Sequence, residues 1–192
     1  MSKKQSIHMR PRSVTGFTLV ELLIVIAILA VLSVTVVLVL NPAELLRQAR
    51  DTRRLSDLSS IHRAISFYLV DQAGSVSWVA SHNCTVGTAS PMGGGVCVTN
   101  SSTVVTGTGW VDVGFSSTTT GSPLAALPLD PTNDATYFYA FKKTSGLVYE
   151  LDSRMESIKY ATTSATEVMS SARDGGNNSG WYEVGNEAGL DL

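Results

Sequence analysis

The sequence is poor in the side chains that carry most enzyme chemistry. Its 192 residues include three histidines and two cysteines, and only 16% of the residues are charged. It has no Gly-x-Ser-x-Gly run, no phosphate-binding loop and no His-Glu-x-x-His run, so the signatures of many hydrolases, nucleotide-binding enzymes and zinc peptidases are missing. The histidines are far apart in the sequence, at His8, His62 and His82. We therefore expect no enzyme and assign no catalytic residue.

Charge is almost absent from one long stretch near the N-terminus. Glu21 is the only charged residue between Phe17 and Leu40, whereas residues 1–16 hold four basic residues and no acid. A helix over 17–40, rising about 1.5 Å per residue, spans roughly 36 Å and crosses a hydrocarbon core of about 30 Å. The basic leader stays on the cytoplasmic side and the rest is exported. We predict a single membrane-spanning helix over 17–40.

This apolar stretch differs from a conventional secretory signal. Such a signal has about 7–15 apolar residues followed by a small residue at the cleavage site. Here the stretch is longer, and the small residue Gly16 precedes it. Cleavage after Gly16 would remove only the leader and keep the helix.

Glu21 is costly in the apolar segment, by about 2.5–3.5 kcal/mol at the centre of a membrane helix, so we expect a partner. After cleavage, the new ammonium group of Phe17 lies four residues earlier and is the natural counter-charge, on the same or a neighbouring subunit. The alternative is that Glu21 reaches the interface in a plain signal anchor.

The residues around the expected cleavage point resemble a known N-terminus. They read Gly16-Phe17-Thr18-Leu19-Val20-Glu21-Leu22-Leu23, between a basic leader and an apolar helix. This string is similar to the start of type IV pilins and type II secretion pseudopilins. The resemblance implies that a prepilin peptidase cleaves between Gly16 and Phe17 and methylates the Phe17 amine. It also implies that Glu21 guides the subunit into a growing filament.

Beyond the apolar stretch, the sequence predicts an α+β protein. Apolar residues three and four apart continue a helical pattern over 41–72, and we expect Pro42 to loosen this helix rather than end it. Residues 73–192 form the head, in which 136–141 and 147–151 predict a β-hairpin with a turn over 142–146. The resemblance implies that the long helix, half transmembrane and half amphipathic, packs on a small antiparallel sheet as in type IV pilins.

The helix over 41–72 also has many charged residues. They lie between the apolar positions, at Arg47, Arg50, Asp51, Arg53, Arg54, Asp57 and Arg63. Two interpretations stay open: a solvated surface supported by pairs three and four residues apart, or a surface complementary to a neighbouring subunit. Nucleic-acid binding is not expected, because acids are interleaved with the arginines and the chain after residue 16 has a net charge of −6, from 10 basic and 16 acidic residues.

The first part of the head looks like a variable, exposed region. It is rich in Gly, Ser and Thr from Gly74 to Ser122, with short valine-rich runs at 97–99 and 111–113 that could form strands. Cys84 and Cys97 form an even pair in an exported chain, which predicts one disulfide; two free thiols are the alternative. A metal site here is not expected, because His82 is the only further ligand nearby.

The second part of the head contains a Leu-Pro-x-Asp-Pro run at 127–131, which resembles the run ahead of a strand in major pseudopilins of type II secretion. Those proteins follow it with a calcium-binding loop. Residues 173–180 are oxygen-rich as such a loop would be, but they do not match an established ligand pattern, and a plain surface loop is favoured. We therefore expect no cofactor, with calcium at 173–180 as the alternative.

Three functions are consistent with these features. The first is a structural subunit that polymerises with like subunits into a type IV pilus-like filament, served by prepilin peptidase and an assembly machinery in the inner membrane. The second is a pseudopilin of a secretion or DNA-uptake system, and the third is a membrane-anchored exported binding module. The precursor would span the cytoplasmic membrane once, surrounded by lipid, and would end in an extracellular pilus or a periplasmic pseudopilus.

Overall fold

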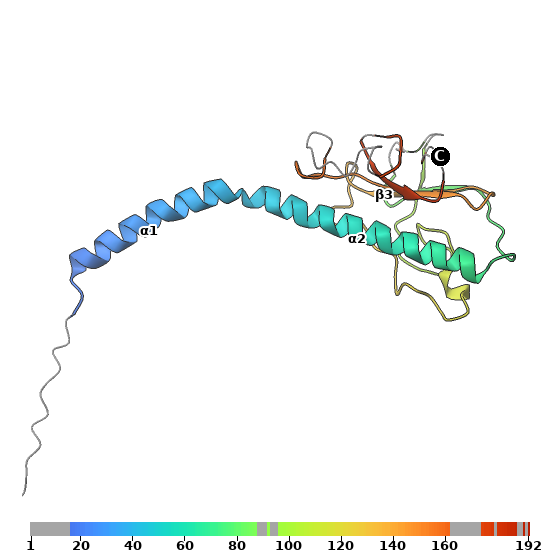
Figure 1. Cartoon of the computed structure of the whole chain (residues 1–192), viewed down its shortest axis with the longest axis horizontal. Helices are drawn as coiled ribbons and strands as arrows, with labels where there is room; N and C mark the ends of the chain where they lie inside the picture. Colours follow the sequence, from blue (N-terminus) through green and yellow to red (C-terminus); the bar gives the residue numbers. More distant parts are fainter. Residues whose placement is uncertain are drawn as a thin grey trace, which may run out of the picture. The chain divides into compact units, whose positions relative to one another are not determined.

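The computed structural model describes residues 16–87, 92, 96–161, 174–178, 180–187, 190 and 192. The chain divides into two compact units, Met1–Pro42 and Ala43–Leu192, which are described separately below (Figure 1).

The first unit contains helix α1, Leu19–Leu40. Thr18 is its N-cap, and the helix has the length and composition to cross a membrane over Leu19–Val37. Two polar side chains within it, Ser33 and Thr35, donate hydrogen bonds to carbonyl oxygens of the preceding turn. Their hydroxyl groups are therefore satisfied inside the helix, as an apolar surrounding requires.

The boundary between the helices differs from our prediction. We expected Pro42 to loosen one continuous helix, but α1 ends at Leu40 and helix α2, Pro42–Asp71, begins at Pro42. Asn41 between them has a φ of 39°, in the left-handed region that Asn adopts more readily than most residues. Proline is well suited to the first position of a helix, where its missing N–H leaves no hydrogen bond unmade.

Helix α2 begins the head and matches the helix predicted over 41–72. The side chains of Leu58, Ile61, Ala64 and Ile65 are buried, as their spacing predicts. Leu45 and Leu46, which belong to the same apolar pattern, are exposed. The apolar side chains of the first turn of α2 are therefore not covered by the head, whereas those of its later turns are.

The sheet of the head has five strands in the order β2-β1-β3-β4-β5. The strands are β1 Ser81–Cys84, β2 Val98–Thr99, β3 Tyr139–Lys143, β4 Tyr149–Ser153 and β5 Tyr182–Gly185. Strands β1 and β2 are parallel and the other neighbours are antiparallel. The predicted hairpin is confirmed as β3–β4, with its turn about two residues later than predicted. The α+β class is also confirmed.

The main core contains α2, residues of β3 and β4, and the long segment between β2 and β3. That segment contributes Trp110, Val111, Val113 and Phe115, all at most 1% exposed. Val111 and Val113 lie outside the strands, so the strand predicted at 111–113 is wrong, whereas the one at 97–99 is β2. The prediction of an exposed region is also wrong for these residues, because their apolar side chains fill the core. A short 3-10 helix, Phe115–Ser117, lies within the segment.

A buried ion cluster joins α2 to two other parts of the head. The Arg54 guanidinium, 0% exposed, donates to Asp51 at 2.8 Å, to both carboxylate oxygens of Asp130 at 2.6 and 2.8 Å, and to Glu156 at 2.7 Å. Arg50 donates two further hydrogen bonds to Glu156. The charged face predicted on α2 is therefore partly wrong, because Asp51 and Arg54 face the interior, whereas Arg47 and Arg53 remain exposed.

The same cluster makes the stability of the head depend on pH. The hydrogen bonds from Arg50, with those from Arg54, lower the pKa of Glu156 below its ordinary value of 4.5. A carboxylate whose pKa is lowered by folding stabilises the folded state above its unfolded pKa, and this contribution is lost as the pH falls through the folded pKa.

Replacing Arg54 tests this cluster. Arg54→Met leaves three carboxylates without their shared cation, so we expect the free energy of unfolding to fall by about 3–5 kcal/mol. Arg53→Met is the matched control, because Arg53 is exposed and lies 3.7 Å from Asp57; about 1 kcal/mol or less is expected there. Urea unfolding of the full chain in detergent, followed by tryptophan fluorescence, reports on the head, which holds all three tryptophans. Equal losses in the two variants would contradict this role.

Candidate functional site

The predicted cleavage point lies in an exposed, non-helical segment. Residues 16–18 precede α1 and are exposed, and a Cβ atom added at Gly16 would meet no atom within 4 Å. Exposed backbone outside regular structure is where peptidases cut most readily. The peptide bond between Gly16 and Phe17 is therefore exposed, and its cleavage stays a prediction.

Glu21 has a local partner at the start of α1. Its carboxylate accepts hydrogen bonds from the Thr18 backbone N–H at 3.1 Å and from the Thr18 hydroxyl at 2.9 Å. In return, the Glu21 N–H donates to the Thr18 hydroxyl oxygen at 3.2 Å. This is a capping box, which satisfies donors that a helix start leaves unpaired. Glu21 thus caps its own helix, a role that we did not predict, and its pairing with the Phe17 amine stays a prediction.

Helix α1 has no apolar partner among the residues of its unit that the structure describes. The large apolar side chains that the structure describes on α1 are between 46% and 82% exposed; Val25 is the least exposed and Val39 the most. An apolar surface of this extent on all sides of a helix is typical of a segment that lies in lipid or between other helices.

Comparison with known proteins identifies this N-terminal segment. Residues 11–37 match the family model described as the prokaryotic N-terminal methylation motif. The chain has the signature of a type IV pilin-like or pseudopilin precursor. The resemblance in the sequence is therefore confirmed over this segment, which includes Gly16, Phe17 and Glu21. No match to the chain was found among curated proteins or among solved structures.

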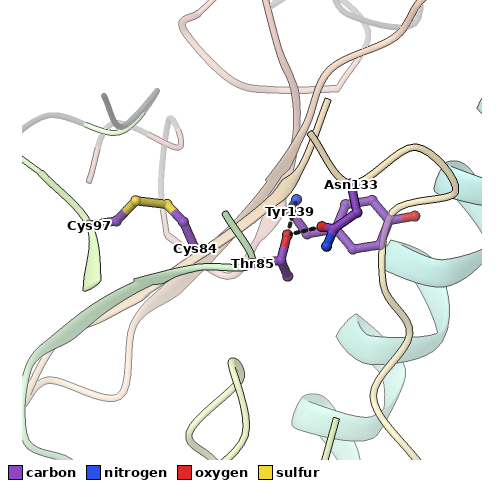
Figure 2. The surroundings of a disulfide bond; sticks show 5 residues. All are labelled: Cys84, Thr85, Cys97, Asn133 and Tyr139. Carbon is purple, nitrogen blue, oxygen red and sulfur yellow. Dashed lines mark hydrogen bonds between the residues drawn. A yellow bond between two sulfur atoms is a disulfide. The ribbon is translucent and has the colours of Figure 1, made fainter. Parts of the chain in front are cut away.

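The head of the precursor has a disulfide between Cys84 and Cys97, as predicted (Figure 2). The two Cα atoms are 5.6 Å apart, and the bond joins the end of β1 to the residue before β2. His82 lies close enough to form a three-ligand group with the two sulfur atoms. The sulfur atoms are bonded to each other, however, and a metal needs thiolates.

Next to the disulfide, Thr85 links three parts of the head (Figure 2). Its hydroxyl donates to the Asn133 side-chain oxygen at 2.7 Å and accepts from the Tyr139 N–H at 3.1 Å. Asn133 follows the Leu-Pro-x-Asp-Pro run, in which Asp130 binds Arg54. Thr85, which follows Cys84 in the chain, thus joins the disulfide-bonded end of β1 to β3 and to the segment that follows the Leu-Pro-x-Asp-Pro run.

The loop considered for calcium is described only in part, because Arg173 and Ser179 lie outside the described residues. The Asp174 carboxylate accepts from the Gly176 N–H at 3.0 Å, and the Asn178 N–H donates to Glu183 of β5 at 2.9 Å. The loop therefore folds back onto β5.

We did not predict that two acidic residues of β4, Glu150 and Asp152, lie beside Glu183. Their two-residue spacing in a strand signals a shared face, but only the strand pairing brings Glu183 to them.

Removing the disulfide should weaken the head. A double variant, Cys84→Ser with Cys97→Ser, is expected to lose about 3 kcal/mol of unfolding free energy, because the bond restricts a short loop in the unfolded chain. Urea unfolding with and without dithiothreitol checks this: the reductant should lower the midpoint of the native chain and leave that of the double variant unchanged. A native chain that does not respond to reduction would contradict the prediction.

Proposed function

We propose that this precursor becomes a structural subunit of a type IV pilus-like filament. Prepilin peptidase cleaves between Gly16 and Phe17 and methylates the new Phe17 amine. The assembly machinery of the inner membrane then moves α1 from lipid into the filament. The single observation that supports this proposal most strongly is the methylation motif on a helix that is apolar on all sides.

Assembly replaces one apolar surrounding by another. In the membrane, α1 contacts lipid; in the filament, it packs against the same helix of other subunits, and the heads form the outside. Lipid tails are as apolar as leucine, so apolar contact alone does not determine how the helices align. A charge pair between Glu21 and the Phe17 amine of a neighbour would set this alignment, because an unpaired charge in an apolar surrounding is costly.

The capping box allows the charge of Glu21 to be tested separately from its hydrogen bonds. Gln at the same position is also a capping-box residue, so Glu21→Gln keeps the acceptor for Thr18 and removes only the charge. Glu21→Ala removes both. We expect both variants to be cleaved nearly normally and to form at least tenfold fewer filaments, counted by electron microscopy of sheared surface fractions.

A control variant isolates the capping role. Thr18→Ala removes the hydroxyl that bonds Glu21 and keeps the carboxylate, so filaments should still form. Normal filament numbers in Glu21→Gln would exclude the charge pair. If filaments are lost in Glu21→Ala and Thr18→Ala but not in Glu21→Gln, the effect is due to helix capping.

A pseudopilin of a secretion or DNA-uptake system is the second candidate, because the methylation motif is shared by both kinds of subunit. The Leu-Pro-x-Asp-Pro run at 127–131, whose Asp130 binds the buried Arg54, favours it. Deletion of the gene discriminates between them: loss of surface filaments indicates a pilus, and lost secretion or uptake with intact filaments indicates a pseudopilus. A membrane-anchored binding module is a third candidate, and a mature chain that keeps its leader would favour it.

A further inference from the structure

The outer strands of the sheet bring three carboxylates together on one face. Alternating residues of β4, Tyr149 and Leu151, pack in the core with α2, so Glu150 and Asp152 lie on the opposite face. Asp152 is the register partner of Glu183 on β5. Oxygen atoms of Glu150, Asp152 and Glu183 all lie within 4.8 Å of one another.

These three carboxylates are buried, with exposed fractions of 1% for Glu150, 0% for Asp152 and 2% for Glu183. Glu150 accepts from the Leu192 N–H at 3.0 Å, and Glu183 accepts from the Asn178 N–H at 2.9 Å. Neither oxygen of Asp152 has a hydrogen-bond partner. A buried polar group is normally hydrogen-bonded, and a buried charge is normally paired or bound to a metal.

The surroundings add negative charge. Asp174, in the loop before β5, lines the same cleft as Glu183. Lys142 of β3 lies opposite Glu150 in the register. None of the ion pairs found in the described part of the chain involves Glu150, Asp152 or Glu183.

The same head neutralises its other buried carboxylates in a different way. Asp51 and Asp130 are also buried, but both are bound by the Arg54 guanidinium. Among the described residues, no arginine binds the carboxylates on β4 and β5 in the way that Arg54 binds Asp51 and Asp130. A cation from solution would fill this role.

A cleft at the edge of the sheet reaches one of the three carboxylates, Glu183. The cleft has a volume of about 370 Å³ and is lined by Asp174, Glu183 and Glu187, with other residues of β5 and with His62 of α2. Gly176 lies under the Glu183 side chain, where a Cβ atom would overlap the carboxylate. The loop backbone at Gly176 can approach Glu183 closely because glycine has no side chain.

We propose that Glu150, Asp152 and Glu183 bind one divalent cation, with Asp174 as a fourth carboxylate at its edge, and that this cation is calcium. Carboxylate oxygens are ligands for hard cations, and calcium accepts six to eight of them in variable geometry, which three or four carboxylates and water can supply. Three of the four proposed ligands lie on the paired strands β4 and β5, whereas a calcium-binding loop takes its ligands from one continuous stretch of chain. The cation would tie β5 and the loop at 174–178 to β4.

The experiment uses the full chain in detergent micelles, stripped with EGTA and titrated with CaCl2 by isothermal calorimetry and by thermal unfolding. We expect one calcium ion per chain. At a calcium concentration about a hundredfold above Kd, the Tm should rise by roughly 5 °C or more. Magnesium at equal concentration should give a smaller shift, because it requires stricter octahedral geometry.

Two variants locate the site. Asp152→Asn and Glu183→Gln should weaken calcium binding at least tenfold, and Asp152→Asn without calcium should be no less stable than the stripped native chain, since one buried negative charge is removed. Asp134→Asn is the matched control: Asp134 is an exposed acid that accepts two backbone hydrogen bonds, and its variant should respond to calcium as the native chain does.

Absence of calcium binding by the native chain would overturn the proposal and favour a proton shared between Glu150 and Asp152. Native affinity in Asp152→Asn and Glu183→Gln would overturn it as well. If one variant fails to fold, calcium binding by the native chain and by the other variant decides. The measurement is made on the single subunit, so its outcome is independent of filament assembly.

Discussion

The head is organised around a buried cation that three acidic groups share. Arg54 lies on α2, Asp130 in the run before β3, and Glu156 in the segment after β4, so one guanidinium joins three parts of the chain that are far apart in sequence. A buried charge of this kind is stable only while its partners are in place. The position of α2 against the sheet, and with it the packing of Leu58, Ile61 and Ile65, is therefore coupled to the loops that supply the carboxylates.

Helix α1 follows a different constraint. Within the described part of its unit it has neither a buried ion pair nor an apolar partner, and its only charged side chain is bound by the capping residue Thr18. A segment of this kind requires an apolar surrounding, which the described residues of its own unit do not supply. Lipid supplies it for the membrane-anchored precursor, and other copies of α1 would supply it in a filament.

The sequence predicted best those features that depend on local pattern. The apolar run predicts α1, the three- and four-residue spacing predicts α2, and the alternation around Tyr139 and Tyr149 predicts the hairpin β3–β4. The even pair of cysteines predicts the disulfide. The methylation motif is also local, which is why the N-terminal segment could be assigned from a short string around Gly16.

Features that depend on long-range contact were missed. In the sequence, Asp51 and Arg54 look like part of a solvated helix face. The partners Asp130 and Glu156 are not apparent there, because each lies at least 76 residues from Arg54. Val111 and Val113 fill the core from an irregular segment, which has no period to reveal it. Glu150 and Asp152 form a cluster only through the pairing of β4 with β5. The break at the left-handed Asn41 is different, because the Asn41-Pro42 pair is a local signal for a helix boundary that we did not use.

The mass of the mature chain is the most direct test of this account. We predict that intact-mass and N-terminal peptide spectrometry of the exported protein will find a chain that begins at Phe17 and carries one methyl group, about 14 Da, on its amine. A chain that begins at or near Met1 would contradict the central claim, because Phe17 would then have no free amine and α1 would remain a permanent signal anchor.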